Sequence, residues 1–260
     1  MQRYFVQLAY NGTNYHGWQF QPNAVTVQEL LEKAFSLLLG QKVEITGAGR
    51  TDTGVHASFF VAHFDVGNAI PDTDKLVQKL NSFLPNDILI YHIFTVEAGF
   101  HARFSALSRT YHYYLSDRKE PFRGEFTARY PYSLDVDLMN EAAALMLQFV
   151  DFTSFSKLHT DVKTNNCKVT TARWERRDGL LVFEIKADRF LRNMVRAVVG
   201  TLIDVGRGKI SIPEFISIVE SKDRREAGTS VDARGLFLTD IEYPQPVHAA
   251  LLRSPSGFPF

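Results

Sequence analysis

Residues 170–187 read TTARWERRDGLLVFEIKA and predict two antiparallel strands joined by a tight turn. Strand-forming residues flank Asp178-Gly179 on both sides, and a two-residue Asp-Gly turn between such segments is a strong hairpin signal. We therefore expect strands at 170–177 and 180–187. This hairpin is the centre of the second half of the chain.

The segments around the hairpin complete a larger unit. Further elements are expected at 109–116 (strand), 135–149 (helix), 190–205 (apolar helix) and 236–243 (strand). A short helix with a capping box from Ser211 to Glu214 precedes the last strand. The order is strand, helix, strand, strand, helix, strand, which is that of the ferredoxin-like fold.

The first half of the chain repeats this order. Strands are expected at 3–10, 42–47, 58–66 and 87–96, and helices at 26–39 and 74–84. The predicted fold is α+β, with two ferredoxin-like or RRM-like βαββαβ units. Their antiparallel sheets are expected to join into one continuous mixed sheet with a central cleft and with the helices on the opposite face.

The expected domain division follows from this repeat. An N-terminal α/β domain spans residues 1–104, a C-terminal α/β domain with a basic surface spans 105–245, and a tail covers 246–260. No Pro/Gly/Ser-rich linker separates the halves, so we expect them to be tightly joined.

Composition narrows the class of protein. The single cysteine, Cys167, excludes an intramolecular disulfide framework and a multi-cysteine zinc site. No apolar run approaches the roughly 20 residues that a membrane-spanning helix needs, and the N-terminus lacks a signal-peptide pattern. We expect a cytoplasmic protein with no membrane partner.

The net charge is zero, but the charges are unevenly distributed. Residues 1–100 carry 6 basic and 9 acidic side chains, residues 101–209 carry 18 and 13, and residues 210–260 carry 5 and 7. Many of the cations in the middle segment are arginines, which suit forked contacts to phosphate. This excess of cations favours a nucleic-acid partner. The signal is weak by itself, because clusters of charged residues are usually just solvent-exposed surface.

The two halves differ in how their middle strands are connected. The first half uses a long loop, roughly Ala48 to Ala57, within the sequence GAGRTDTGVHA at residues 47–57. Hairpin loops are normally 2–5 residues long, and longer loops tend to be functional. Asp52 near Arg50 in a glycine-rich loop is a plausible nucleophile. A loop in which Asp52 caps its own backbone amides is the other interpretation of these residues.

Two other interpretations of this loop fail. A dinucleotide-binding motif requires G-x-G-x-x-G at the start of a helix, whereas here the spacing differs and a strand follows. Asp52-Thr53-Gly54 matches the D-T-G of aspartic proteases, but those enzymes need two carboxylates and no second D-T-G or D-S-G occurs.

The loop resembles the signature of the tRNA pseudouridine synthase A family. Further segments resemble the family's motifs in the right order, over roughly residues 4–243: Tyr10-Asn11-Gly12-Thr13, Gly17-Trp18-Gln19, residues 100–106, residues 109–113, residues 151–155, residues 190–196 and residues 235–238. Thr53 stands where the family usually has Ala, and Asn11 where it usually has Asp. Neither departure removes a reactive group.

The resemblance implies an isomerase that converts uridine to pseudouridine at positions 38, 39 and 40 of the tRNA anticodon stem-loop. The N1–C1′ bond breaks, the uracil rotates and C5 bonds to C1′, so no cofactor or metal is required. The nucleophile adds to C6 of the uracil or acts at C1′, and the sequence leaves both routes open. The family also implies a homodimer with tRNA as its partner.

The resemblance also assigns residues. Asp52 is the catalytic nucleophile, Tyr111 stacks on the uracil and takes part in proton transfer, Arg196 pairs with Asp52, and Arg50 fills the gap left by the flipped base. Substrate-binding roles fall on Tyr111, Arg50, Thr51, Arg103, Arg192 and Leu236.

Interpretations that give these residues a purely structural role stay open. Without the resemblance, Tyr111 is a strand aromatic in the core and Arg196 is a helix-surface arginine. His56 and His63 are expected to be structural, and no histidine set has metal-ligand spacing. The alternative function is a non-catalytic tandem RNA-binding module that remodels tRNA.

Overall fold

The computed structural model describes residues 1–157 and 164–252. These residues form the predicted mixed α+β fold, with nine strands in a mixed sheet and six α-helices, whereas eight strands and five helices were expected. The contacts group them into two units, one of Met1–Leu107 with the segment from Leu238 onward, and one of Ser108–Phe237. None of the described helices is long and apolar enough to span a bilayer.

The first unit has the strand order β4-β1-β3-β9, with β2 paired to β3. Its elements are β1 (Gln2–Tyr10), α1 (Val27–Leu39), β2 (Ile45–Gly47), β3 (His56–Val66), α2 (Thr73–Phe83), β4 (Ile88–Val96), most of β9 (Leu236–Glu242) and α6 (Val247–Ala250). A short 3-10 helix, η1 (Gly12–Asn14), follows β1. The predicted order of strands and helices is confirmed.

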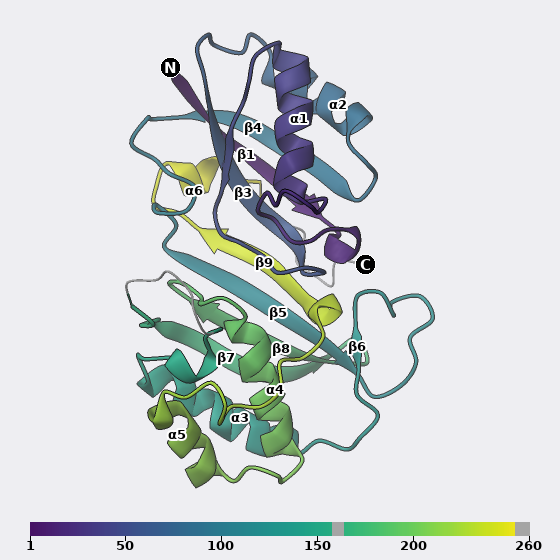
Figure 1. Ribbon diagram of the computed structural model, residues 1–260, viewed down its shortest axis with the longest axis vertical. Helices are drawn as coiled ribbons and strands as arrows, with labels where there is room; N and C mark the ends of the chain where they lie inside the picture. The colour runs from purple at the N-terminus through teal and green to yellow at the C-terminus, as the bar shows by residue number, and fades with distance from the viewer. Residues whose placement is uncertain (158–163, 253–260) are drawn as a thin grey trace. The chain divides into compact units, whose positions relative to one another are not determined.

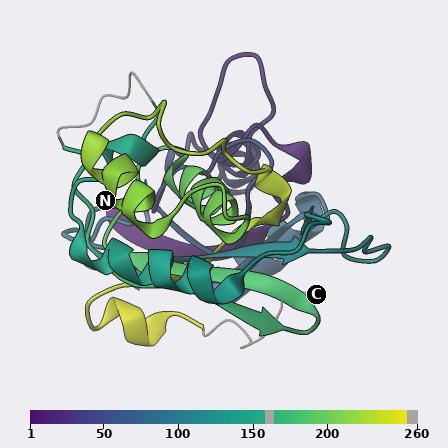
Figure 2. The ribbon, with the colours of Figure 1, turned by 90° about the horizontal axis from the view of Figure 1, so that it is seen from below.

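Helices α1 and α2 pack against each other over these strands (Figure 1). Phe35 of α1 meets Phe64 of β3 with 4.8 Å between ring centres. Tyr4 stacks on the same Phe64 at 5.5 Å. Seen from below, α6 lies on the side of the strands away from α1 (Figure 2), so one short helix departs from the expected one-sided arrangement.

The second unit has the strand order β5-β8-β7, with the short β6 paired parallel to β5. Its elements are β5 (Ser108–Ser116), β6 (Ala128–Arg129), α3 (Val136–Leu145), β7 (Val169–Arg177), β8 (Leu180–Ala187), α4 (Met194–Gly206) and α5 (Ile212–Ser221). The 3-10 helices are η2 (Met146–Gln148), η3 (Thr153–Phe155) and η4 (Ala233–Gly235). Asp178 and Gly179 form the predicted hairpin turn, with φ angles of 52° and 78°.

Several boundaries differ from the prediction. The helix expected at 135–149 ends at Leu145 and is followed by η2. The apolar helix expected at 190–205 begins at Met194, because Asn193 precedes it in the left-handed conformation (φ 65°). The strand expected at 42–47 is reduced to Ile45–Gly47. There the backbone amide of Val43 donates to the Ser36 hydroxyl on α1 (2.9 Å) instead of to a neighbouring strand.

Helix caps follow the sequence closely. Ser211 and Glu214 form the complete capping box predicted for α5. At the start of α1, Thr26 accepts a hydrogen bond from the Glu29 amide (3.4 Å), but the Glu29 carboxylate pairs with Lys33 (2.6 Å). The Thr26-x-x-Glu29 sequence, which has the spacing of a capping box, therefore forms only half of one.

Candidate active site

Residues 48–55 connect β2 to β3 in the first unit and carry the acidic residue singled out above. The Ala48 amide donates to Val61 O (2.8 Å), and the Val55 amide donates to Asp52 O (3.1 Å). The second bond closes a turn in which Gly54 has a φ of 77°. Asp52 is half-buried at this turn, and Arg50 is exposed. The loop thus presents a carboxylate from a hydrogen-bonded turn.

A second segment, residues 10–18, packs directly against this loop. A Cβ on Gly12 would lie 2.0 Å from Val55 O, and a Cβ on Gly17 would lie 2.3 Å from Thr51 O. Both distances are far below any allowed contact, so only glycine permits the two backbones to approach so closely. The loop is therefore held on both sides of Asp52.

Side chains reinforce this contact at Thr51. The Tyr10 hydroxyl and Thr51 Oγ1 share a hydrogen bond of 2.9 Å, and the Trp18 amide donates to Thr51 O (3.3 Å). The Trp18 ring stacks on Phe60 with 4.1 Å between centres. Buried aromatic packing thereby fixes the residue that immediately precedes Asp52.

Tyr15 links the other flank of the loop to Asp87, the residue that precedes β4. The Gly54 amide donates to Tyr15 O (3.2 Å), and the Tyr15 hydroxyl donates to the Asp87 carboxylate. Burial and this hydrogen bond raise the pKa of the Tyr15 hydroxyl. Asn14 also donates to Asp87 (3.2 Å). Asp87 was not singled out from the sequence, because nothing in its local pattern indicates a contact with residues 14 and 15.

The histidines around the loop have structural hydrogen bonds. His56 is fully buried, and its Nδ1 accepts from the Gly12 amide (3.0 Å). His63 Nδ1 accepts from the Ala102 amide (3.2 Å), and burial followed by the nearby His101 lowers the pKa of His63 to about 4. Within residues 1–157 and 164–252, no cluster of three or more His, Cys, Asp or Glu side chains could hold a metal ion.

Tyr111 lies on β5 in the second unit, opposite Ile185 of β8. It is half-buried, and its ring meets Phe190 edge-on with 5.0 Å between centres. Tyr113 points from the same face of the strand but is almost completely buried, and its hydroxyl donates to Asp232 O (3.0 Å). Of these two tyrosines, Tyr111 has the surface to meet a ligand.

Arg196 lies in the first turn of α4 and is half-buried. Its Nε donates to Val231 O (2.7 Å), and its own carbonyl accepts from the Val231 amide (3.2 Å). Arg192 is exposed and precedes the helix. Arg189, Arg192 and Arg196 are spaced nearly as on a helix, but α4 contains only Arg196, so the three do not form one helical face.

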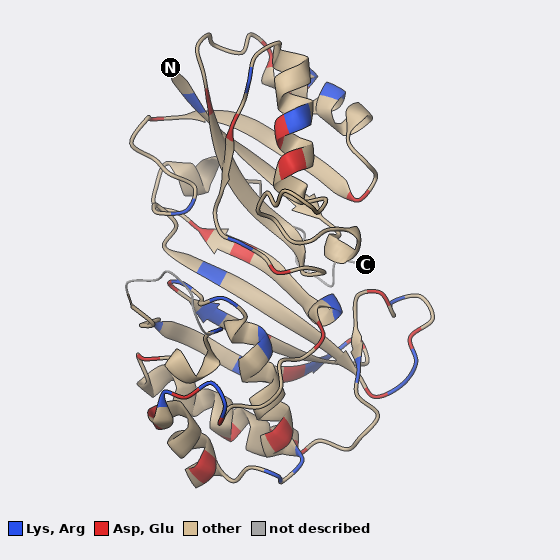
Figure 3. Ribbon diagram, in the orientation of Figure 1, with Lys and Arg blue, Asp and Glu red and all other residues tan. Residues whose placement is uncertain are grey.

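The remaining predicted binding residues differ in exposure. Arg103 is exposed, in a turn where its amide donates to His101 Nδ1 (3.1 Å). Leu236, at the start of β9, is 5% exposed. Figure 3 shows basic residues at several positions along the second unit, which agrees with the excess of cations in its sequence. The structure thus brings Arg50, Thr51 and Asp52 together, and separately places Tyr111, Arg192 and Arg196 in the second unit.

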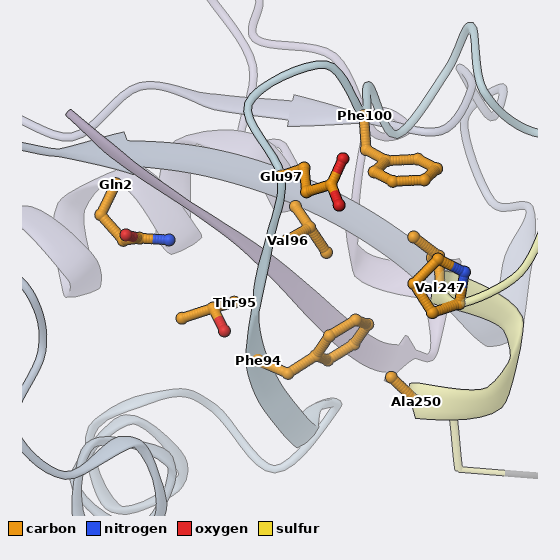
Figure 4. Close-up of a pocket in the computed structure, with 9 residues that line it drawn as sticks. Gln2, Phe94, Thr95, Val96, Glu97, Phe100, Val247 and Ala250 are labelled. Atoms are coloured by element: carbon orange, nitrogen blue, oxygen red, sulfur yellow. The ribbon is translucent and has the colours of Figure 1, made fainter.

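A hollow of about 430 Å³ in the first unit lies elsewhere (Figure 4). It is lined by β4 and α6, with Phe94, Val96 and Val247 among its apolar walls. None of the predicted site residues lines it. This hollow therefore adds nothing to the candidate site at Asp52.

Comparisons with known proteins agree with the sequence motifs. The family described as tRNA pseudouridine synthase matches residues 7–105 and 148–244. A tRNA pseudouridine synthase A of Porphyromonas gingivalis is 55% identical over 247 residues, which is 94% of this chain and 98% of that protein. The enzyme of the same name from Parabacteroides distasonis is 53% identical over 245 residues, covering 94% and 97%. One from a Thermoanaerobacter strain is 42% identical over 246 residues, covering 94% and 100%.

Proposed function

The chain belongs to the tRNA pseudouridine synthase family, and we propose that it modifies uridines 38, 39 and 40 of the anticodon stem-loop with Asp52 as the nucleophile. The protein is an isomerase that converts uridine in tRNA to pseudouridine. In this reaction the N1–C1′ bond breaks and a C5–C1′ bond forms, while the hydrogen on C5 leaves as a proton and N1 takes up a proton.

The observation that carries the assignment of Asp52 is the way its loop is held. Gly12 and Gly17 pack against the backbone on either side of it, and Tyr10 bonds Thr51. A nucleophile gains most when its approach is fixed before the substrate arrives, because the entropy of alignment is already lost on folding. An aspartate that merely capped its own loop would not need a second segment pressed against both flanks.

Tyr111 and Arg196 complete the proposed chemistry. We propose that the half-buried Tyr111 ring stacks on the uracil and that its hydroxyl takes part in removing the C5 proton. The Nε contact of Arg196 with Val231 O sets the direction of the guanidinium, which we propose pairs with Asp52 and keeps it charged. Both possible routes, addition to C6 and attack at C1′, need that charge.

Binding of the tRNA is proposed to involve exposed cations and the loop itself. Arg50 is exposed next to Asp52 and suits insertion into the space left by a flipped base, since an enzyme acting on a base must unstack it. Arg103 and Arg192 are proposed to contact phosphates, with Thr51 and Leu236 at the target nucleotide. We also propose a homodimer that acts in the cytoplasm.

Tritium release from tRNA labelled at C5 of uridine tests the proposal. Wild-type protein should release tritium to water, and Asp52→Asn should bind tRNA as well as wild type but lose at least about 10³-fold of the rate. Asp178→Asn is the matched control, because it changes the same side chain in the corresponding turn of the second unit. If Asp52→Asn released tritium, the assignment of Asp52 as the nucleophile would be wrong. Binding without any release by wild type would favour the non-catalytic RNA-binding module.

A further inference from the structure

A groove of about 880 Å³ runs through the second unit. One wall is α4, another is the loop between β5 and β6, and the third is the segment 229–234. A Cβ on Gly200 would lie 1.9 Å from Thr229 O, so α4 and that segment are packed backbone to backbone. The groove is therefore built on rigid walls along α4.

Basic residues outnumber acidic ones in this groove, six to three. Each carboxylate is already paired: Glu120 with Arg118 (3.1 Å), Asp204 with Lys209 (3.1 Å) and Asp232 with Arg234 (3.0 Å). Three further cations, Lys119, Arg129 and Arg207, have no carboxylate at ion-pair distance in the described part of the chain, and all are exposed. The groove thus carries uncompensated positive charge. The elements that line it contain both basic and acidic residues (Figure 3).

Aromatic rings orient one of these cations. The Arg207 guanidinium lies over Tyr132 at 5.1 Å from the ring centre and over Tyr130 at 6.0 Å. A guanidinium held on aromatic faces has lost part of its rotational freedom, so less entropy remains to be lost when it binds a phosphate. Arginine also offers the forked donors that match phosphate oxygens.

The groove shares a wall with the proposed catalytic arginine. Val231 lines the groove and is hydrogen bonded to Arg196 in both directions. Helix α4 extends from Arg196 in its first turn to Arg207 just after its last, a distance of about 16 Å at 1.5 Å per residue. A strand lying in the groove would therefore run from Arg207 toward Val231, the residue that contacts Arg196.

We propose that this groove binds the sugar–phosphate backbone of the substrate tRNA through Lys119, Arg129 and Arg207, which deepens and rests on the proposed function. An extended polyanion matches a groove in which these three cations come from the β5–β6 loop, from β6 and from the end of α4. Because its contacts are to phosphate, the groove serves affinity and not the chemical step.

Salt-dependent tRNA binding tests this assignment. Filter retention of unmodified tRNA is measured over a series of salt concentrations for wild type, Arg129→Ala, Arg207→Ala and the triple alanine variant of Lys119, Arg129 and Arg207. Each single variant should bind several-fold more weakly. The slope of log K against log salt should become shallower by about 0.7–0.9 for each cation lost. Tritium release at saturating tRNA should stay within about twofold of wild type.

Two variants serve as controls. Arg176 lies on β7, is exposed, and does not line the groove, so Arg176→Ala should change neither affinity nor slope. Arg207→Lys keeps the charge and should keep the wild-type slope. Equal melting temperatures of the variants confirm that the fold is intact.

The outcomes separate the groove from the activity. If the triple variant binds tRNA with wild-type affinity and slope, the assignment fails, and an acidic protein segment becomes the occupant to test. If affinity and slope are unchanged but the saturated rate falls, the residues support chemistry and the assignment also fails. Failure of the proposed function would appear instead as tRNA binding by wild type without tritium release.

Discussion

The loop between β2 and β3 and the turn between β7 and β8 occupy the same place in the two repeats, yet they are built differently. In the second unit two residues, Asp178 and Gly179, connect strands of nine and eight residues. In the first unit eight residues separate β2 from β3, and β2 is only three residues long. The same order of elements thus supports a plain turn in one repeat and the candidate active site in the other.

The two connections also differ in what holds them. The turn at Asp178-Gly179 is specified by its own residues, both of which adopt positive φ. The loop at Asp52 is held by residues about 40 positions away in the sequence, at Gly12 and Gly17. The short turn is encoded locally, whereas the loop that carries the candidate carboxylate is fixed by tertiary contacts.

Among changes that leave Asp52 itself in place, the largest effect is expected where that tertiary contact is removed. Gly12→Ala places a Cβ 2.0 Å from Val55 O, so the loop must move away from residues 10–18. We expect tritium release to fall by about 10²-fold or more, since misplacement by 1 Å can cost that much. Unfolding in urea should show a loss of about 2–4 kcal/mol.

Gly49→Ala is the matched control inside the loop. A Cβ there meets nothing within 4 Å, and Gly49 does not adopt a positive φ. The variant should keep wild-type activity and stability. If the two alanine variants behaved alike, the loop would not depend on its contact with residues 10–18.

A smaller difference between the units is expected in acid. Burial, and then His101, lowers the pKa of His63 in the first unit to about 4, whereas an unfolded histidine titrates near 6.5. Between these pH values the unfolded chain binds more protons, so stability falls as the pH drops from 6.5 to 4. In urea unfolding over this pH range, we expect the free energy of unfolding of wild type to fall by about 2 kcal/mol more than that of His63→Gln.

Glu184 in the second unit gives the contrast. The hydrogen bond from His112, and then the one from Arg173, lowers the pKa of the Glu184 carboxyl to about 2. The ionised Glu184 carboxylate contributes fully to stability above the pKa of an unfolded glutamate, near 4.3. This contribution is lost only as the pH falls toward 2. Glu184→Gln should therefore follow the wild-type slope between pH 6.5 and 4.5. A flattened slope for this variant in that range would contradict the difference between the units.

The smallest effect is expected at the turn of the second unit. Asp178 has a φ of 52°, which asparagine adopts readily. Asp178→Asn should change stability by no more than a few tenths of a kcal/mol and leave tritium release at the wild-type rate. Thermal unfolding and the release assay measure both. A large loss of activity would mean that the short turn, too, has a functional role.

Most elements could be predicted from the sequence because their signals are local. Alternation marked the strands, apolar spacing marked the helices, and Asp178-Gly179 marked the hairpin. The misplaced boundaries have nonlocal or conformational causes. The Ser36 side chain captures the Val43 amide, and Asn193 takes a left-handed conformation before α4.

The candidate site, like the fold, could be predicted only in part from the sequence. The length and glycine content of residues 47–57 pointed to Asp52, and the order of motifs pointed to the family. The contact of Tyr15 with Asp87, 72 residues further along the chain, had no signal in either local sequence. Nothing in the sequence indicated that Lys119, Arg129 and Arg207 line one groove.

The sequence by itself therefore determined the order of strands and helices, the short turn, and which loop carries the candidate carboxylate. Only the tertiary structure decided how that carboxylate is held and which exposed cations line a common groove. The physical reason is that backbone propensity and periodicity act over a few residues. Close packing of Gly12 on Val55, or of Gly200 on Thr229, exists only once the chain has folded and distant segments meet.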